Sequence, residues 1–290
     1  MRIRPLYDRP QPTISFEYFP PKSPEAEETL VRETTPGLLK LKPAFFSITY
    51  GAGGGTRDST LRIANRLRKD YGIEPISHLT CVGSTREQLS HYLDEARASG
   101  LENVLALRGD PPKGQSSFEA VAGGFSYAVD LIRFVKSRGD FCIGAACYPE
   151  GHVESANKHD DWDHAAAKVE AGAEFLISQL FYDWSDFLDM VDYLRNKHKV
   201  TVPIIPGILP FQGTEQIKRF TTLCGSKLPK PLRDKLEAHA KDEEAVRQLG
   251  VETCTDICQK LLECGVPGFH FYCLNRVPSV TQILGNLGLA

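Results

Sequence analysis

The sequence predicts an α/β fold, a closed (β/α)8 or TIM barrel that forms a single domain over residues 1–290. Short apolar, β-branched or aromatic runs recur along the chain, and amphipathic helical segments lie between them. The eight runs cover residues 13–19, 45–50, 75–81, 104–110, 142–148, 175–180, 202–208 and 268–273. Strands that alternate with helices favour a parallel sheet, and eight such units in a chain of this length favour a closed barrel.

The segments between the runs support this fold. Residues 60–71 and 87–98 each carry apolar side chains at spacings of three to four, so we expect these helices to pack on the outside of the barrel. The connection over residues 209–267 is much longer than the others and is predicted to be an insertion between the seventh and eighth strands. Its helical segments are expected at 214–223, 232–239 and 251–264.

Composition excludes several classes of partner. The formal net charge of −3 leaves no basic stripe for nucleic acid or an anionic membrane, so small molecules are the expected partners. No apolar run approaches the length of a membrane span, and the arginine-containing N-terminus lacks the apolar segment of a signal peptide, which together predict a cytoplasmic protein. Cys254, Cys258 and Cys264 have no nearby histidine at a zinc spacing, so we expect reduced thiols and no metal site.

Two carboxylates end strands at the face where barrel enzymes carry their chemistry. Glu17 alternates with Phe16 and Tyr18, and a carboxyl desolvated inside the barrel could hold a proton near neutral pH, as a general acid does. Asp110 follows a strand end on a turn stiffened by prolines. A buried structural ion pair is the alternative for Glu17, and a loop-capping side chain is the alternative for Asp110.

Other polar residues also end strands. Gln179 could both donate to and accept from a heteroaromatic ring, or it could be a satisfied core amide, and Thr49 and His78 occupy comparable strand ends. The glycine-rich segment 51–55 lacks the dinucleotide and P-loop spacings, so we expect a mobile loop that lets a ligand approach the backbone.

The segment after the fifth run contains a loop and then a helix with charged residues. Asp161, His164 and Lys168 share one face of this helix. Mixed acidic and basic groups there suit a ligand with ribose hydroxyls and phosphates, although a solvated salt-bridge face is the alternative.

Several ordered motifs together resemble the methylenetetrahydrofolate reductase family, and the match covers nearly the whole chain. The motifs are FEYFPPK at 16–22, SITYG at 47–51, HLTC at 78–81, LRGDP at 107–111, YPEGH at 148–152, QLF at 179–181, PGILP at 206–210 and HFYCLNR at 270–276. The resemblance implies an FAD-dependent oxidoreductase in which NADH or NADPH reduces the flavin and is then replaced by folate. The reduced flavin would convert 5,10-methylenetetrahydrofolate to 5-methyltetrahydrofolate, supplying methyl groups for methionine synthesis.

The resemblance also implies roles for individual residues. Glu17 matches the general acid that helps to open the imidazolidine ring, and Asp110 matches the carboxylate near flavin and pterin. Gln179 matches the amide that contacts the pterin, and Arg276 matches a contact to the folate tail. The implied FAD-binding residues are Thr49, His78, Arg108, Tyr148, His152, Asp161, His164 and Lys168.

Two positions depart from the family pattern, and some alternatives stay open. Ala167 stands where some members have a basic residue, and Thr214 stands where others have an aromatic that stacks on the substrate, so Phe211 is expected to supply that ring. The end at Ala290 resembles the short catalytic form without a regulatory domain. A different flavin- or phosphate-binding barrel enzyme, or a non-catalytic folate- or flavin-binding barrel, remains an alternative. The sequence is also compatible with a homo-oligomer.

Overall fold

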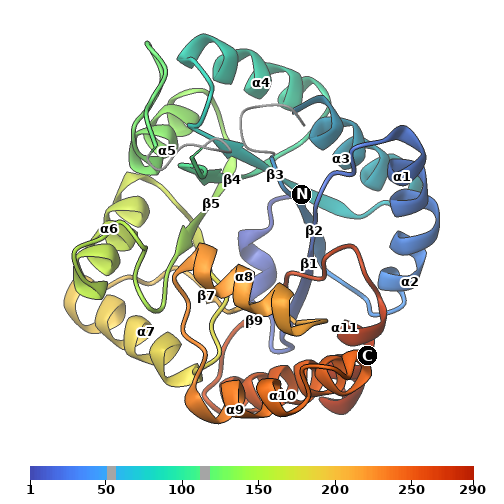
Figure 1. The fold of residues 1–290 in the computed structure, drawn as a ribbon. Helices are drawn as coiled ribbons and strands as arrows, with labels where there is room; N and C mark the ends of the chain where they lie inside the picture. Colours follow the sequence, from blue (N-terminus) through green and yellow to red (C-terminus); the bar gives the residue numbers. More distant parts are fainter. Residues whose placement is uncertain (51–56, 112–117) are drawn as a thin grey trace.

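A computed structural model confirms the predicted barrel and describes residues 1–50, 57–111 and 118–290. Its parallel strands follow the order β7-β6-β5-β4-β3-β2-β1-β9-β8 and are surrounded by helices (Figure 1). The strands are β1 (Thr13–Tyr18), β2 (Phe45–Ile48), β3 (Glu74–Thr80), β4 (Asn103–Leu107), β5 (Cys142–Cys147), β6 (Phe175–Ser178), β7 (Ile204–Ile205), β8 (Gly207–Ile208) and β9 (Gly268–Phe271). Except for the seventh run, each strand ends one to three residues before the end of its predicted run, because the last residues of the runs lie in loops.

The seventh predicted run forms two short strands instead of one. Pro206 separates β7, which pairs with β6, from β8, which pairs with β9. A proline has no N–H to donate, so it interrupts the ladder. The N–H of Gly207 donates to Ser178 Oγ at 2.9 Å, and the carbonyl of Pro206 accepts from the N–H of His270 at 3.0 Å. The two ends of the sheet are therefore joined by the chain itself.

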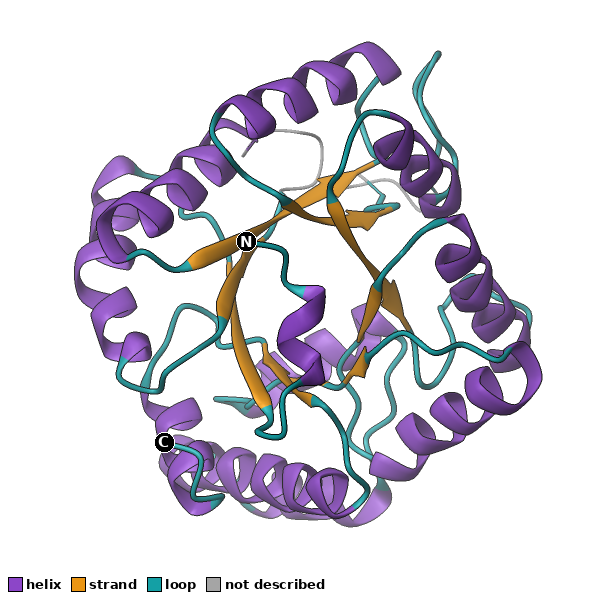
Figure 2. Cartoon of the chain, turned by 180° about the vertical axis from the view of Figure 1, so that it is seen from behind, coloured by secondary structure: helices purple, strands orange, loops and turns teal. Residues whose placement is uncertain are grey.

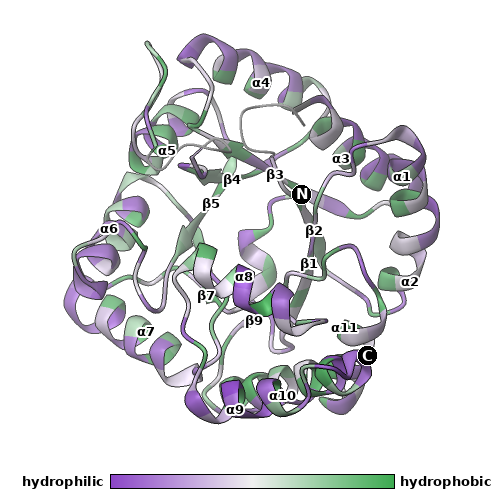
Figure 3. Cartoon of the chain, in the orientation of Figure 1, coloured by the Kyte–Doolittle hydropathy of each residue, from purple (hydrophilic) through white to green (hydrophobic). Residues whose placement is uncertain are grey.

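The outer layer consists of helices whose apolar faces turn toward the strands (Figure 3). They are α1 (Pro24–Thr29), η2 (Leu30–Thr34), α2 (Thr35–Leu39), α3 (Arg57–Tyr71), α4 (Arg86–Ala98), α5 (Ala128–Ser137), α6 (Lys158–Ala171), α7 (Trp184–His198) and α11 (Pro278–Asn286). The helices predicted at 60–71 and 87–98 are thus confirmed. α4 begins at a capping box, in which Gln88 N–H donates to Thr85 Oγ1 at 3.2 Å and Thr85 N–H donates to Gln88 Oε1 at 2.8 Å.

The insertion between the seventh and eighth predicted strands contains the three expected helices, α8 (Thr214–Cys224), α9 (Lys230–Ala238) and α10 (Glu243–Glu263). α10 begins earlier than predicted, because Asp242 caps it by accepting the N–H of Ala245 at 3.0 Å. In Figure 1, α8 lies across the end of the barrel, whereas α9 and α10 lie outside it. α8 buries Thr214, Ile217 and Thr221, so it forms a cover over part of the mouth.

The opposite end of the barrel is plugged by the 3-10 helix η1 (Arg4–Asp8), which Figure 2 places over the strand starts. Ile3, Leu6 and Tyr7 pack there against Phe45 and Phe175 in a buried apolar cluster. This packing leaves the carboxyl ends of the strands as the end of the barrel that can receive a ligand.

No helix in the described ranges is both long enough and apolar enough to cross a membrane.

Candidate active site

A cluster of buried polar side chains lies inside the barrel, centred on Glu17. Glu17 Oε2 accepts from Ser47 Oγ at 3.3 Å and lies 3.4 Å from the Nε2 atoms of both His78 and His270. Ser47 Oγ is also within hydrogen-bond distance of both rings, at 3.2 Å from His78 Nε2 and 3.3 Å from His270 Nε2. Ser15 Oγ lies 2.8 Å from His270 Nδ1 and holds the ring from its other side.

Strand register brings this cluster together. β1 pairs with β2 so that Glu17 is beside Ser47, and with β9 so that Ser15 is beside His270. Alternate residues of a strand face the same side, so Ser15 and Glu17 both point into the barrel. Of this cluster, the sequence analysis assigned roles only to Glu17 and His78. Ser15, Ser47 and His270 were missed, although their period-two positions in neighbouring runs carried a signal.

The cluster corrects the expectation that burial makes Glu17 a carboxyl protonated near neutral pH. Burial does raise its pKa, but the hydrogen bond from His270 and the charges of both histidines outweigh burial, and the net pKa is lowered. Burial lowers the pKa of His78 to about 4, only partly offset by Glu17. In the ligand-free protein near neutral pH, Glu17 is therefore ionised and His78 is neutral. The charge of His78 acts on Glu17 only in acid, where the two groups titrate together.

A second group of predicted residues lies where β4, β5 and α6 meet. Arg108 donates through both terminal nitrogens to Glu154, at 2.5 Å and 2.9 Å. The rings of Tyr148 and His152 lie edge to face with centroids 4.9 Å apart. Burial lowers the pKa of His152, and the neighbouring Arg108 lowers it further. These residues form a compact, partly basic wall of the mouth.

The helix α6 carries two of its three predicted ligand residues toward this wall. Lys168 Nζ donates to the carbonyl of Ala146 at 2.8 Å and lies 5.8 Å from the ring centroid of Tyr148, and burial lowers its pKa. Asp161 is buried, with Oδ1 accepting from Ser155 at 3.2 Å, while Oδ2 has no hydrogen-bond partner among the described residues. His164 is exposed, so the structure does not bring it together with the other two.

Gln179 lies just after β6 at the rim. Its Oε1 accepts from the N–H of Leu180 at 2.8 Å, which leaves the amide NH2 as the group available to a ligand. Tyr272, which the sequence analysis left unassigned, donates to the carbonyl of Ser178 at 2.7 Å and holds the end of β6 against β9.

Asp110 is exposed in the loop after β4. Gly109 before it has φ +86°, and a Cβ there would lie 2.6 Å from Val82, so this turn requires glycine. The pKa values of Tyr148 and Cys224 are raised mainly by burial and further by the charge of Asp110. Asp110 therefore lies near enough to Tyr148, just after β5, and to Cys224, at the C-terminal end of α8, for its charge to act on both.

Two further predicted residues lie on the rim. Thr49 follows β2, where its N–H donates to Tyr18 O at 2.9 Å and its carbonyl accepts from Thr60 at 2.9 Å. Arg276 is exposed in the turn after β9, where Leu274 and Asn275 have positive φ. The glycine-rich segment 51–55 lies outside the described residues.

The placement of Phe211 argues against its predicted stacking role. Its ring is fully buried and packs edge to face on Tyr182 at 5.8 Å, while its backbone lies against Gly250 of α10. A ring enclosed in this way has no face free for a ligand, so the structure places Phe211 in the core beneath α8. Thr214 is buried at the start of α8, and its Oγ1 has no hydrogen-bond partner in the described part of the chain.

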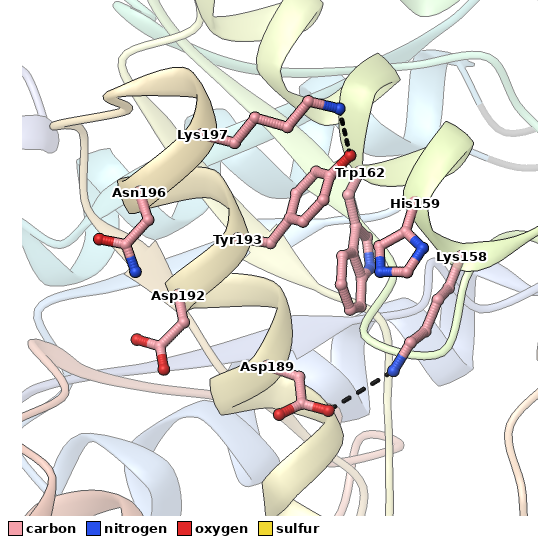
Figure 4. Close-up of a pocket in the computed structure, with 8 residues that line it drawn as sticks. All are labelled: Lys158, His159, Trp162, Asp189, Asp192, Tyr193, Asn196 and Lys197. Atoms are coloured by element: carbon pink, nitrogen blue, oxygen red, sulfur yellow. Dashed lines mark hydrogen bonds and ion pairs between the residues drawn. The ribbon is translucent and has the colours of Figure 1, made fainter.

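A hollow on the outer surface between α6 and α7 is separate from this mouth. Its lining is Lys158, His159, Trp162, Asp189, Asp192, Tyr193, Asn196 and Lys197 (Figure 4). Lys158 pairs with Asp189 at 3.5 Å and lies 4.9 Å from the Trp162 ring centroid. Lys197 pairs with Asp163 at 3.0 Å. These contacts join two neighbouring helices, so we assign the hollow to helix packing.

The fold and its mouth define a class of protein: an α/β barrel with ionisable side chains gathered at the carboxyl ends of its strands. Within this class the chain belongs to the methylenetetrahydrofolate reductase family, whose family model matches residues 2–288.

Known proteins agree with this assignment. A maize methylenetetrahydrofolate reductase (NADH) 1 is 41% identical over 95% of this chain, which spans 48% of that relative. The 5,10-methylenetetrahydrofolate reductase of Pectobacterium carotovorum is 35% identical, with 95% of this chain and 90% of the relative covered. The chain thus spans about half the length of its plant relatives and most of the bacterial one.

A solved structure supports the fold independently. A Clostridium thermocellum protein described as binding two copies of 5-methyl-5,6,7,8-tetrahydrofolic acid superposes with a TM-score of 0.69 at 20% identity, covering 98% of this chain and 95% of its own.

Proposed function

We propose that this barrel reduces 5,10-methylenetetrahydrofolate to 5-methyltetrahydrofolate, with NADH as electron donor and FAD as bound cofactor, and so supplies methyl groups for methionine synthesis. The observation that carries the proposal is the buried Glu17 cluster inside the mouth, because this reaction needs a proton donor shielded from water. Family membership supports the substrate, and the names of the maize and Arabidopsis relatives support NADH.

The second group of residues suits FAD. Asp161 Oδ2 is buried without a partner and could accept a ribose hydroxyl, while Lys168 and Arg108 carry the positive charge that a pyrophosphate requires. We assign Thr49, His78, Tyr148 and His152 to the same cofactor as weaker contacts, whereas the exposed His164 could reach only an outlying part of it. When bound, FAD would supply the hydride acceptor and donor that protein side chains lack.

Each catalytic side chain then has a distinct task. The bound folate would exclude water from Glu17 and raise its pKa, so that the carboxylate takes up a proton from solvent and passes it to the amine that departs when the imidazolidine ring opens. Ser47 and His270 hold the carboxylate that remains. The negative charge of Asp110 stabilises the cationic iminium that results. The NH2 group of Gln179 donates to the pterin, and Arg276 at the rim pairs with the carboxylates of the folate tail.

A half-reaction experiment tests the proposal. The purified protein, reconstituted with FAD, should show a flavin absorbance spectrum that NADH bleaches under anaerobic conditions and that 5,10-methylenetetrahydrofolate restores. Bleaching without reoxidation by the folate would point to another flavin-dependent barrel oxidoreductase. A protein that takes up folate or flavin but is not bleached by NADH or NADPH would be a binding protein.

A further inference from the structure

The loop that joins α8 to α9 is attached to the rim of the barrel at a small number of points. Gly225 ends α8 with φ +71° and packs against Val153, where an added Cβ would lie 2.5 Å from Val153 Cγ1. Ser226 Oγ donates to the carbonyl of Leu180 at 2.7 Å. The next residue, Lys227, donates its backbone N–H to Glu150 Oε1 at 2.9 Å. The position of α8 over the mouth therefore depends on residues 225–227.

Glu150 is an unusual partner for such an attachment. It lies in the loop after β5, and its side chain is only 4% exposed. Oε1 accepts the Lys227 N–H, but Oε2 is buried and has no hydrogen-bond partner among the described residues. A buried, half-satisfied carboxylate is costly, and protonation removes most of that cost.

The charged groups around Glu150 act in opposite directions. Asp186 of α7 raises the Glu150 pKa, and the ammonium group of Lys227 lowers it. Lys227 Nζ lies 3.9 Å from Glu150 Oε1 and 3.7 Å from Asp186 Oδ1, but its side chain is 67% exposed and its charge is screened by solvent. Burial is the largest cause and raises the pKa of Glu150 to about 7, although the Lys227 N–H and the Ser226 hydroxyl both lower it by favouring the ionised carboxyl.

We propose that the Glu150 carboxyl is a proton-controlled clasp that positions α8: protonated, it holds residues 225–227 and the C-terminal end of α8 against the rim, and ionised, it releases them. The sign follows from linkage. In the docked state Glu150 is buried, and burial outweighs the hydrogen bonds and the charge that the loop contributes, so its affinity for a proton exceeds that of an exposed carboxyl and protonation favours docking. Docking is complete below the ordinary range of a glutamate and is lost as the pH rises through about 7.

The clasp rests on these contacts and not on the proposed reaction, so it can be tested without folate or flavin. The measurement is the hydrogen-exchange protection factor of the Lys227 amide between pH 6 and pH 8. A protection factor is used because it already corrects for the effect of pH on the chemical exchange rate. We expect protection to fall roughly tenfold per pH unit once the pH exceeds the pKa. Trypsin gives a second readout, because cleavage after Lys227 should accelerate at high pH relative to a free peptide, whereas Lys230 precedes proline and resists cleavage.

Variants of Glu150 separate the clasp from simple packing. Glu150→Gln keeps the shape and the acceptor but cannot ionise, so protection should stay high and independent of pH. Glu150→Ala removes the acceptor, so protection should be low at every pH. A wild-type protein with constant protection from pH 6 to pH 8, or a Glu150→Gln variant with the wild-type pH dependence, would overturn the proposal.

Two variants leave Glu150 itself intact and should shift the transition in opposite directions. Asp186→Asn removes a charge that raises the pKa, so release should begin at lower pH. Lys227→Met removes a charge that lowers the pKa, so release should begin at higher pH. Lys230→Met is the matched control, because Lys230 pairs with Asp234 away from the clasp and should leave the transition in place. Shifts of the same sign in the first two variants would contradict the clasp.

Discussion

Glu17 in the barrel interior and Glu150 at the rim both have side chains that are largely shielded from solvent, yet their pKa values move in opposite directions. The two side chains are 7% and 4% exposed. Glu17 has a hydroxyl and two imidazoles around one oxygen, and its pKa is lowered. Glu150 has one N–H on one oxygen, none on the other, and Asp186 nearby, and its pKa is raised to about 7. Burial therefore sets the size of the penalty for the charged form, while the neighbouring groups decide whether the carboxyl stays ionised.

The largest expected effect comes from removing the proton that Glu17 transfers. Glu17→Gln keeps the shape of the side chain, so flavin reduction by NADH should persist. Folate reduction should fall by about 10²–10⁴, the usual loss for a general acid. Stopped-flow measurement of the two half-reactions checks this. An equal loss in both would make Glu17 a structural carboxylate.

The next largest expected effect is on the stability of the protein, and it comes from His78. Its pKa is lowered to about 4, so the unfolded chain takes up a proton between the ordinary histidine value and pH 4 while the native protein does not. The free energy of unfolding should therefore fall by about 1–3 kcal/mol as the pH drops through this window. Urea titrations at several pH values should give a shallower pH dependence for His78→Gln. His91, exposed on α4, is the control position, and His91→Gln should keep the wild-type dependence.

The smallest expected effect concerns the neighbours that lower the Glu17 pKa. His270→Gln removes the ring that contributes most to lowering the Glu17 pKa, so that pKa should rise by about one unit or more. Carbon-13 NMR of labelled glutamate carboxyls measures the shift. Ser15→Ala, which leaves His270 in place but frees its Nδ1, should give a smaller rise. An unchanged Glu17 titration in the His270 variant would mean that Ser47 and His78 alone hold the charge.

The fold could be predicted from the sequence because the period and spacing of apolar residues are properties of short segments. The strands, the outer helices and the three helices of the insertion follow from the pattern of apolar residues. The break at Pro206 was also readable in principle, since proline cannot continue a ladder. The pattern could not reveal that the residues on the two sides of Pro206 would form separate strands, one at each end of the sheet.

The site was less predictable because it depends on register between distant segments. Glu17 and His78 were identified as strand-end residues, but the contact of Glu17 with His270 joins residues far apart in the chain. The sign of the Glu17 pKa therefore could not follow from burial alone. Phe211 was inferred from closeness in sequence to Thr214, whereas the packing of α10 on this segment decides where its ring lies.

The junction between β7 and β8 at Pro206 limits where the chain could be opened by circular permutation. Elsewhere in the barrel, neighbouring strands are held by a ladder, so new chain termini in an exposed connection such as the one around Lys241 would leave the sheet intact. β7 pairs with β6 and β8 pairs with β9, and the junction between them is held by the covalent chain and by the hydrogen bonds that Gly207 and Tyr272 donate to Ser178. A circular permutant opened at residue 206 would leave the barrel closed there mainly by these two hydrogen bonds, so we expect this two-strand run to tolerate a cut poorly.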